Sequence, residues 1–275
     1  MEFLQQRHWH TTVMREDKKT IIAKTDYMDN LIERRAVIKV DVFSLEIIEA
    51  WLDRLGRAGD MAEKRQYIEK LKGVKAYLGN GRPLKEALQE AGDQLERSLF
   101  NESVIGIIQA ETFLYKERGY SDAATYNRFW EEYYLGSCRY YSNLDQVKSS
   151  WIDFVGTSLR QENLFNRGKC QQMMRDQNGD YLIWGSLIDT FHQMSTFIKV
   201  DQGMKITAAH GQLIRMPDAV CSSAAVLMDN LPGVDLSGIS KKELAGILGA
   251  GQGCIHIIDL VWDSAQTLKS YRGEA

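Results

Sequence analysis

The sequence is poor in proline, nearly balanced in charge and free of long hydrophobic runs. Only 3 of 275 residues are proline, so little interrupts a helix, and the hydrophobic periodicity favours a helix-rich chain. A net charge of −3 gives no electrostatic attraction to nucleic acid. The longest apolar runs, such as residues 104–108, are too short to span a bilayer, and the N-terminus lacks the pattern of a signal peptide. We therefore expect a cytoplasmic protein with neither nucleic acid nor a membrane as partner.

Cysteine is also scarce. The four cysteines form no C-x-x-C pair, which excludes a disulfide framework. As reduced thiols, Cys221 and Cys254 are free to bind metal or to react, whereas Cys138 and Cys170 have no comparable setting and are predicted to be structural. The chain contains no G-x-S-x-G, Walker A or H-E-x-x-H motif, so none of these common catalytic arrangements applies.

The two halves of the chain resemble each other at an offset of 160 residues. The same four residues stand at 38–41 and 198–201, and the same offset recurs 33 positions later at Leu71 and Leu231. Internal similarity at a fixed offset indicates a duplicated unit. We predict a degenerate first repeat at residues 1–119, a helical insert at 120–165, and a second repeat at 166–275 that carries the candidate site.

Each repeat is predicted to be a small antiparallel sheet followed by helices, which is an α+β fold. The expected strands are residues 13–14, 20–23 and 36–40 in the first repeat and 171–174, 180–187 and 191–200 in the second, with a hairpin turn at residues 176–179. The expected helices are residues 44–55, 64–77, 84–95 and 103–116, and then 219–230, 241–248 and 254–270.

The insert between the repeats is dense in aromatic residues. Ser121 and Asp122 predict the start of a helix over residues 123–135, which Gly136 ends, and a second helix is expected over residues 143–161. The aromatic residues of the first helix form one stripe, at positions 126, 129, 130, 133 and 134. Two interpretations stay open: the stripe packs the repeats together, or it forms the wall of a pocket for an aromatic ligand.

Two cysteines and two histidines of the second repeat form a candidate site. Cys221 and Cys254 each precede an apolar helical pattern, and a helix N-terminus lowers the pKa of a thiol and favours the thiolate that binds metals. His192 lies in a predicted strand. His256 follows Cys254 by two residues, so within a helix their side chains would point about 200° apart unless Cys254 precedes the first turn. Buried inert thiols and a core histidine are the plain alternatives.

The order of features in the second repeat resembles a known scaffold. The features are a short sheet, then Cys221, Leu231-Pro-Gly233, a helix from Lys241, and Cys254 before the last helix. In this order they resemble the NifU N-terminal/IscU-type scaffold over roughly residues 185–270. The resemblance implies Cys221 and Cys254 as ligands and a role as a sulfur or iron–sulfur carrier. Separately, Pro217-x-x-x-Cys221 and the segment 253–257 resemble an uncharacterised bacterial domain family with a Gly-Cys-Thr-His-Leu signature, which has no assigned function.

The chain departs from the scaffold at the start of the sheet. The scaffold has a further cysteine there, with an aspartate two residues on, but this chain has Asp189 and His192 instead. Clusters are usually held by cysteines, so an iron–sulfur cluster is less expected than a mononuclear zinc or iron ion with mixed ligands. The sequence thus predicts an ion on His192, Cys221 and Cys254, with Asp189 and His256 as acid–base groups.

The first repeat lacks the predicted ligands but keeps the aspartate, because Asp29 matches Asp189. The replacements are His192 by Ile32, Cys221 by Met61 and, with a short gap, Cys254 by Phe100. Joint loss of polar groups favours one site per chain, in the second repeat, and leaves a structural role open for the retained aspartate.

Together these patterns predict a metal-dependent enzyme of the hydrolase or lyase type that acts on a small organic substrate, for which the insert suggests an aromatic group. A sulfur or iron–sulfur carrier and a non-catalytic interaction protein are the alternatives. Whether the chain forms a homo-oligomer or has a protein partner stays open.

Overall fold

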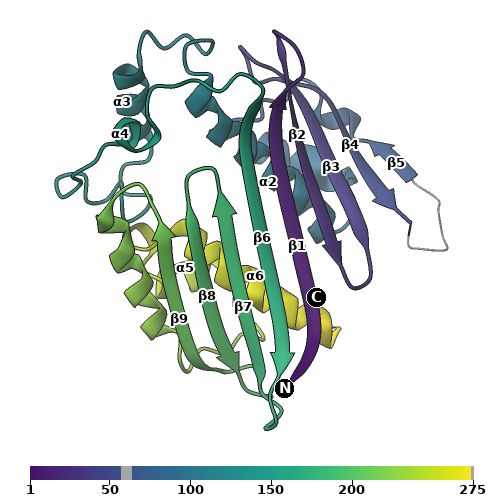
Figure 1. The fold of residues 1–275 in the computed structure, drawn as a ribbon. Coiled ribbons are helices and arrows are strands. Elements are labelled where there is room, and N and C mark those ends of the chain that lie inside the picture. Colours follow the sequence, from purple (N-terminus) through teal and green to yellow (C-terminus); the bar gives the residue numbers. More distant parts are fainter. Residues whose placement is uncertain (57–63, 274–275) are drawn as a thin grey trace. The chain divides into compact units, whose positions relative to one another are not determined.

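The computed structural model describes residues 1–56 and 64–273, which form a mixed α+β fold (Figure 1). Their strands hydrogen-bond in one antiparallel nine-stranded sheet with the order β5-β4-β3-β2-β1-β6-β7-β8-β9. The chain divides into two compact units, of which unit 1 comprises residues 1–7, 127–157 and 169–275, and unit 2 residues 8–126 and 158–168. Each unit is described by itself.

Unit 2 contains a meander of sequential hairpins backed by a helix. Its strands are most of β1 (Glu2–Arg15), β2 (Thr20–Asp29), β3 (Glu33–Asp41), β4 (Ile47–Leu55), β5 (Lys64–Tyr67) and the start of β6 (Asn163–Arg175). Helix α2 (Gln94–Ala110) packs on β2 and β3. Asp93 and Glu96 form a capping box that fixes where this helix begins.

Unit 1 contains the hairpins β7 (Tyr181–Asp189), β8 (Gln193–Val200) and β9 (Ile206–Arg215), next to the end of β6. Every second residue of β8 is buried, so one face of the sheet meets the core. Helix α6 (Ile255–Arg272) packs on β7 and β8, while the 3₁₀ helix η4 (Ala219–Asn230) packs on β9 and α5 (Lys241–Ile247) packs on α6 (Figure 1).

The expected helix over residues 44–55 is wrong, because residues 47–55 form strand β4. Its apolar residues fit both a helical and an extended pattern, and the segment pairs residue by residue with β3, for example Ala50 with Ile38. β-branched and aromatic side chains such as Ile47 and Trp51 favour this pairing. A helix over residues 64–77 is also wrong: the region holds β5 and the short 3₁₀ helix η1 (Glu69–Leu71).

The remaining helices of the first half are shifted. Residues 84–95 hold parts of α1 (Gly81–Ala87), η2 (Leu88–Glu90) and the start of α2, and residues 103–116 hold the end of α2 and η3 (Glu111–Phe113). The expected strands of the first half, by contrast, are longer than predicted, and β4, β5 and β9 were not predicted at all. The expectation of a helix-rich chain is therefore wrong, since scarcity of proline permits long strands as well as helices.

In the second half the prediction fits better. The hairpin turn is confirmed, with the amide of Asp176 bonded to the carbonyl of Asp180 at 2.9 Å and Gly179 at φ +87°. Helices are confirmed at residues 241–248 and 254–270, whereas residues 219–230 wind as a 3₁₀ helix. In the insert, α3 (Ala123–Tyr133) is confirmed, but the expected helix over residues 143–161 is limited to α4 (Trp151–Val155).

Corresponding elements of the two halves lie about 160 residues apart. The strand pairs β2–β3 and β7–β8 share this offset, and so do the isolated bridges between Glu46 and Lys75 and between Lys205 and Asp235, within one residue. A non-glycine residue with positive φ precedes both β4 and β9, and these residues are Leu45 and Met204. The division at residues 119 and 165 remains a prediction.

Within residues 1–56 and 64–273, no helix combines the length and the apolar character needed to cross a membrane.

Candidate metal centre

The site begins at the tight turn between β7 and β8. Asp189 is the last residue of β7, and its Oδ1 accepts hydrogen bonds from the backbone amides of Phe191 at 2.8 Å and His192 at 2.6 Å. The amide of Asp189 donates to the carbonyl of His192 at 2.8 Å. An aspartate that accepts backbone N–H groups two and three residues on is a common way to close such a turn.

The corresponding turn of the first half is closed in the same way. Oδ1 of Asp29 accepts the amides of Leu31 at 2.7 Å and Ile32 at 2.9 Å, and the amide of Asp29 donates to the carbonyl of Ile32 at 3.1 Å. Asp189 therefore has a structural role that needs no metal. The turns differ at all three residues after the aspartate, and the difference that brings in an imidazole is the third, Ile32 in one and His192 in the other.

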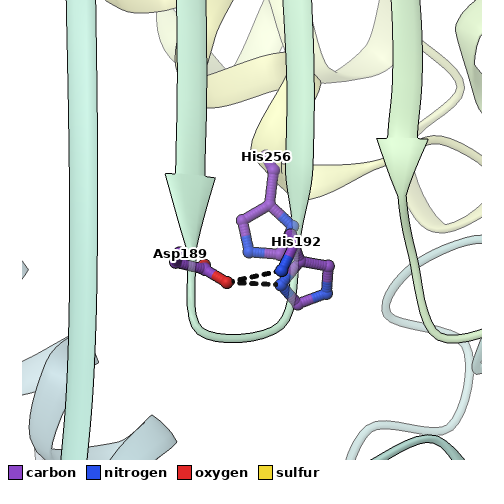
Figure 2. Close-up of side chains that lie close together, drawn as sticks. All are labelled: Asp189, His192 and His256. Carbon is purple, nitrogen blue, oxygen red and sulfur yellow. Dashed lines mark hydrogen bonds and ion pairs between the residues drawn. The ribbon is translucent and has the colours of Figure 1, made fainter.

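His256 reaches this turn from the first turn of α6, as Figure 2 shows. Cys254 is the N-cap of α6, with an extended backbone at φ −114° and ψ 120°, so it precedes the first helical turn. The condition under which Cys254 and His256 can face the same point is thus met. Gly253 makes the close approach of the preceding loop possible, because a Cβ there would overlap the carbonyl oxygen of Leu248.

Asp189, His192 and His256 bring three potential ligand atoms together, all within 4.8 Å of one another. Oδ1 of Asp189 lies 3.2 Å from Nδ1 of His192, and the two imidazole centroids are 4.4 Å apart (Figure 2). Two nitrogen or oxygen ligands on one tetrahedral zinc ion are about 3.3 Å apart. The group therefore fits a single ion after small side-chain adjustments.

The surroundings of this group restrict its ligands. Asp189 and His192 are buried, and His256 is half-buried. The contact between Asp189 and His192 has two uses: the carboxylate can bind the ion itself, or it can fix Nδ1 so that Nε2 faces the ion. Either arrangement makes the aspartate part of the centre.

Two further residues beside the group were not predicted. Nη2 of Arg215, the last residue of β9, donates to the backbone carbonyls of Asp189 and, at 3.3 Å, of His192. The only sequence signal was its replacement of Leu55 at the 160-residue offset. Trp151 of the aromatic insert stacks on His192 with centroids 6.2 Å apart and contacts Phe191 at 4.8 Å. An aromatic wall therefore lies next to one imidazole.

The structure places the two predicted cysteine ligands outside the group of three. Cys221 is buried in the core of unit 1 and does not belong to the group of three. Cys254 is half-buried, and its Sγ lies 3.9 Å from Nδ1 of His256. Of the predicted site residues, Asp189, His192 and His256 are thus brought together, Cys254 lies beside His256, and Cys221 is not part of the group.

The expected lowering of the thiol pKa by helix N-termini is not found. Burial raises the pKa of Cys221 to about 12, and the nearby thiols of Cys254 and Cys138 add to the rise. Burial likewise raises the pKa of Cys254 to about 11, although the nearby backbone amides of Ile257 and His256 oppose the shift. Desolvation of a thiolate outweighs the partial charge of the helix N-terminus at both positions.

The counterparts in the first half are apolar where the structure describes them. Ile32 lies in the β2–β3 turn, Phe100 is buried in α2, and Met61 lies outside the described residues. A cavity of about 710 Å³ lies elsewhere in unit 1, lined by residues of the 235–247 segment such as Asp235, Glu243 and Ile247. The three grouped side chains do not line it.

Comparison with known proteins returned one match. A family model described as "Protein of unknown function (DUF2889)" matches residues 170–269, a stretch that contains all the residues of the candidate centre except Trp151. No curated protein and no solved structure matches the chain. The match agrees with the expected resemblance to a family without an assigned function, whereas the resemblance to the NifU/IscU scaffold is supported by none of the comparisons.

Proposed function

We propose that the protein is a metal-dependent enzyme with one zinc or iron ion on Asp189, His192 and His256. The observation that carries this proposal is the convergence of a carboxylate and two imidazoles from the β7–β8 turn and the start of α6. Two histidines and one carboxylate form catalytic zinc sites and also the open iron sites of oxygenases, and three ligands leave a position for a substrate or water.

The ion would supply Lewis acidity or an activated water, which suits a hydrolase or lyase. Asp189 orients His192 through the contact at Nδ1, and Arg215 fixes the turn that carries both ligands. Trp151 and Phe191 offer aromatic faces next to His192, so a small organic substrate with an aromatic ring is the substrate class we propose. Beyond this substrate, we expect no nucleic acid or membrane partner, and a cytoplasmic location.

We further propose that the fold is a tandem repeat in which only the second copy carries the centre. Support comes from the shared 160-residue offset of the strands and from the identical closing of the two turns by Asp29 and Asp189. At positions 160 residues apart, the second half has His192 and Arg215 where the first half has Ile32 and Leu55.

The carrier alternative has less support. A sulfur carrier needs a reactive and accessible thiol, yet Cys221 is buried and burial raises its pKa to about 12. No observation favours an iron–sulfur cluster over a mononuclear ion, and a purely non-catalytic interaction protein would have no use for the grouped imidazoles.

Metal content tests the proposal. Protein purified with and without oxygen is analysed by plasma mass spectrometry and absorbance, as wild type and as the variants His192→Ala and His256→Ala. The exposed His210 of β9 provides a matched control in His210→Ala. We expect about one ion per chain in wild type and control and loss of the ion in both site variants. Equal metal content in all four proteins refutes the assignment, and acid-labile sulfide supports the carrier instead.

A further inference from the structure

The position of Cys254 suggests more than packing. Its Sγ lies 3.9 Å from Nδ1 of His256. In a tetrahedral zinc site with a sulfur bond of about 2.3 Å and a nitrogen bond of about 2.0 Å, the sulfur and nitrogen ligands lie about 3.5 Å apart. The observed separation is therefore close to that of two ligands on one ion.

Cys254 has the freedom to turn toward the ion. As the N-cap of α6 it has an extended backbone, and its side chain makes no capping hydrogen bond. Because Cys254 is not among the residues whose ligand atoms lie within 4.8 Å of one another, its sulfur would reach the ion by rotation about the Cα–Cβ bond. Asp259, a second candidate donor on α6, instead pairs with Lys241 at 2.7 Å.

The loop before Cys254 is nevertheless held firmly. The amide of Arg139 donates to the carbonyl of Gly253 at 2.7 Å, and Nδ2 of Asn143 donates to Oε1 of Gln252 at 3.2 Å. These contacts come from the aromatic insert within unit 1. They keep the backbone of Cys254 next to the centre.

We propose that Cys254 is a displaceable fourth ligand that closes the metal centre in the resting protein. This inference rests on the proposed centre of Asp189, His192 and His256. On closing, the thiol gives its proton to solvent, a sulfur–metal bond forms, and a bound water leaves. On opening, that bond breaks, a water or substrate atom takes the position, and the sulfur regains a proton. A three-ligand site is open to substrate, whereas a four-ligand site is closed.

Cobalt(II) is the probe, because a thiolate ligand gives it a sulfur-to-cobalt charge-transfer band. Wild type, Cys254→Ser and the control Cys221→Ser are loaded with cobalt, and cobalt content is measured on each. We expect the band in wild type and in Cys221→Ser, and its loss in Cys254→Ser with cobalt still bound. A band that persists in Cys254→Ser, or a stoichiometric cobalt complex of wild type without the band, overturns the inference and leaves the three-ligand centre standing.

Azide tests whether the position is closed. Because Cys254→Ser leaves the fourth position to water, azide should change its cobalt spectrum at a concentration at least about 10-fold lower than wild type requires, a tenfold difference being 1.4 kcal/mol. Equal azide affinity overturns the closing role. Failure of the wild type to bind cobalt at all, in the same way as His192→Ala, instead overturns the proposed function and this inference together.

Discussion

Exchange of the two turn aspartates for asparagine separates the structural role of Asp189 from its proposed role at the metal. Asp29 and Asp189 close equivalent turns through the same pair of backbone hydrogen bonds. Asparagine keeps an oxygen at the accepting position but carries no charge, so Asp29→Asn and Asp189→Asn should both fold.

The cost to stability should be similar in the two variants. Hydrogen bonds to an ionised acceptor are roughly twice as strong as neutral ones, and a neutral one contributes about 1 kcal/mol net. Loss of the charged part of two such bonds lowers the free energy of unfolding by about 1–2 kcal/mol in either variant. Asp29 also accepts a hydrogen bond from the hydroxyl of Tyr27 at 2.6 Å, and Asp189 contacts Nδ1 of His192 at 3.2 Å, so metal-free protein reports the turn together with one further contact in each variant.

Added zinc distinguishes the variants. At a zinc concentration 100 times the dissociation constant of the wild type, binding raises the free energy of unfolding by about 2.7 kcal/mol. Asp29→Asn should keep this increment. If Asp189→Asn weakens zinc binding by about 10–100-fold, as loss of a group that binds or orients a ligand does, the increment falls to about 1.4–0.4 kcal/mol.

Urea denaturation with and without zinc measures the increment, and zinc titration calorimetry measures the affinity directly. An increment of Asp189→Asn equal to that of wild type refutes the role of Asp189 at the metal. If Asp29→Asn also loses the increment, zinc binding does not depend specifically on Asp189, and the proposed centre is refuted.

Three further perturbations test other parts of the reasoning. Arg215→Leu introduces the residue that stands at position 55, 160 residues earlier. It should weaken zinc binding about 10–100-fold with little change in stability, because the turn that carries two proposed ligands loses the hydrogen bonds of Arg215. Unchanged zinc affinity in titration calorimetry contradicts this prediction. Cys221 of the native metal-free protein should react with iodoacetamide at pH 8 about 1000-fold more slowly than a thiol of pKa 9, because a pKa of about 12 lowers the thiolate fraction by about three powers of ten. The rate should rise as the pH approaches 12, and a mass-spectrometric time course equal to that of the unfolded chain refutes the prediction. Gly253→Ala should destabilise the protein by roughly 2–4 kcal/mol because its Cβ meets the Leu248 carbonyl, and a melting temperature like that of wild type would contradict the packing of this loop.

The fold was predictable where local sequence and long-range pairing agree. The turn at Asp176–Gly179 and the helix after Cys254 follow from local chemistry, and both are present. Residues 47–55 are the opposite case, because their apolar spacing suits a helix and only pairing with β3 makes them a strand. Sheet partners distant in sequence decide such segments, and a local pattern cannot supply them.

The candidate centre shows the same division. The residue types were recognisable, since His192, His256 and Asp189 were singled out as chemical groups. They were also expected in one site, but with His192, Cys221 and Cys254 as the ligands. That Asp189, His192 and His256 form the group depends on the β7–β8 turn and on where α6 begins, which the sequence does not reveal. Cys221 was misjudged for a related reason: a helix N-terminus near a thiol is visible in sequence, but the desolvation that raises its pKa appears only with the packed core.

The two turns also suggest how a metal centre can arise without new backbone. Asp29 closes its turn with Ile32 three residues on, and no imidazole is needed for that geometry. Placing His192 at the same position puts Nδ1 within 3.2 Å of a carboxylate that the turn had already oriented. Arg215 in place of leucine then ties down the carbonyls of that turn, and His256 arrives from α6. The proposed centre of the second half would therefore be built on a turn aspartate that has the same structural role in both halves.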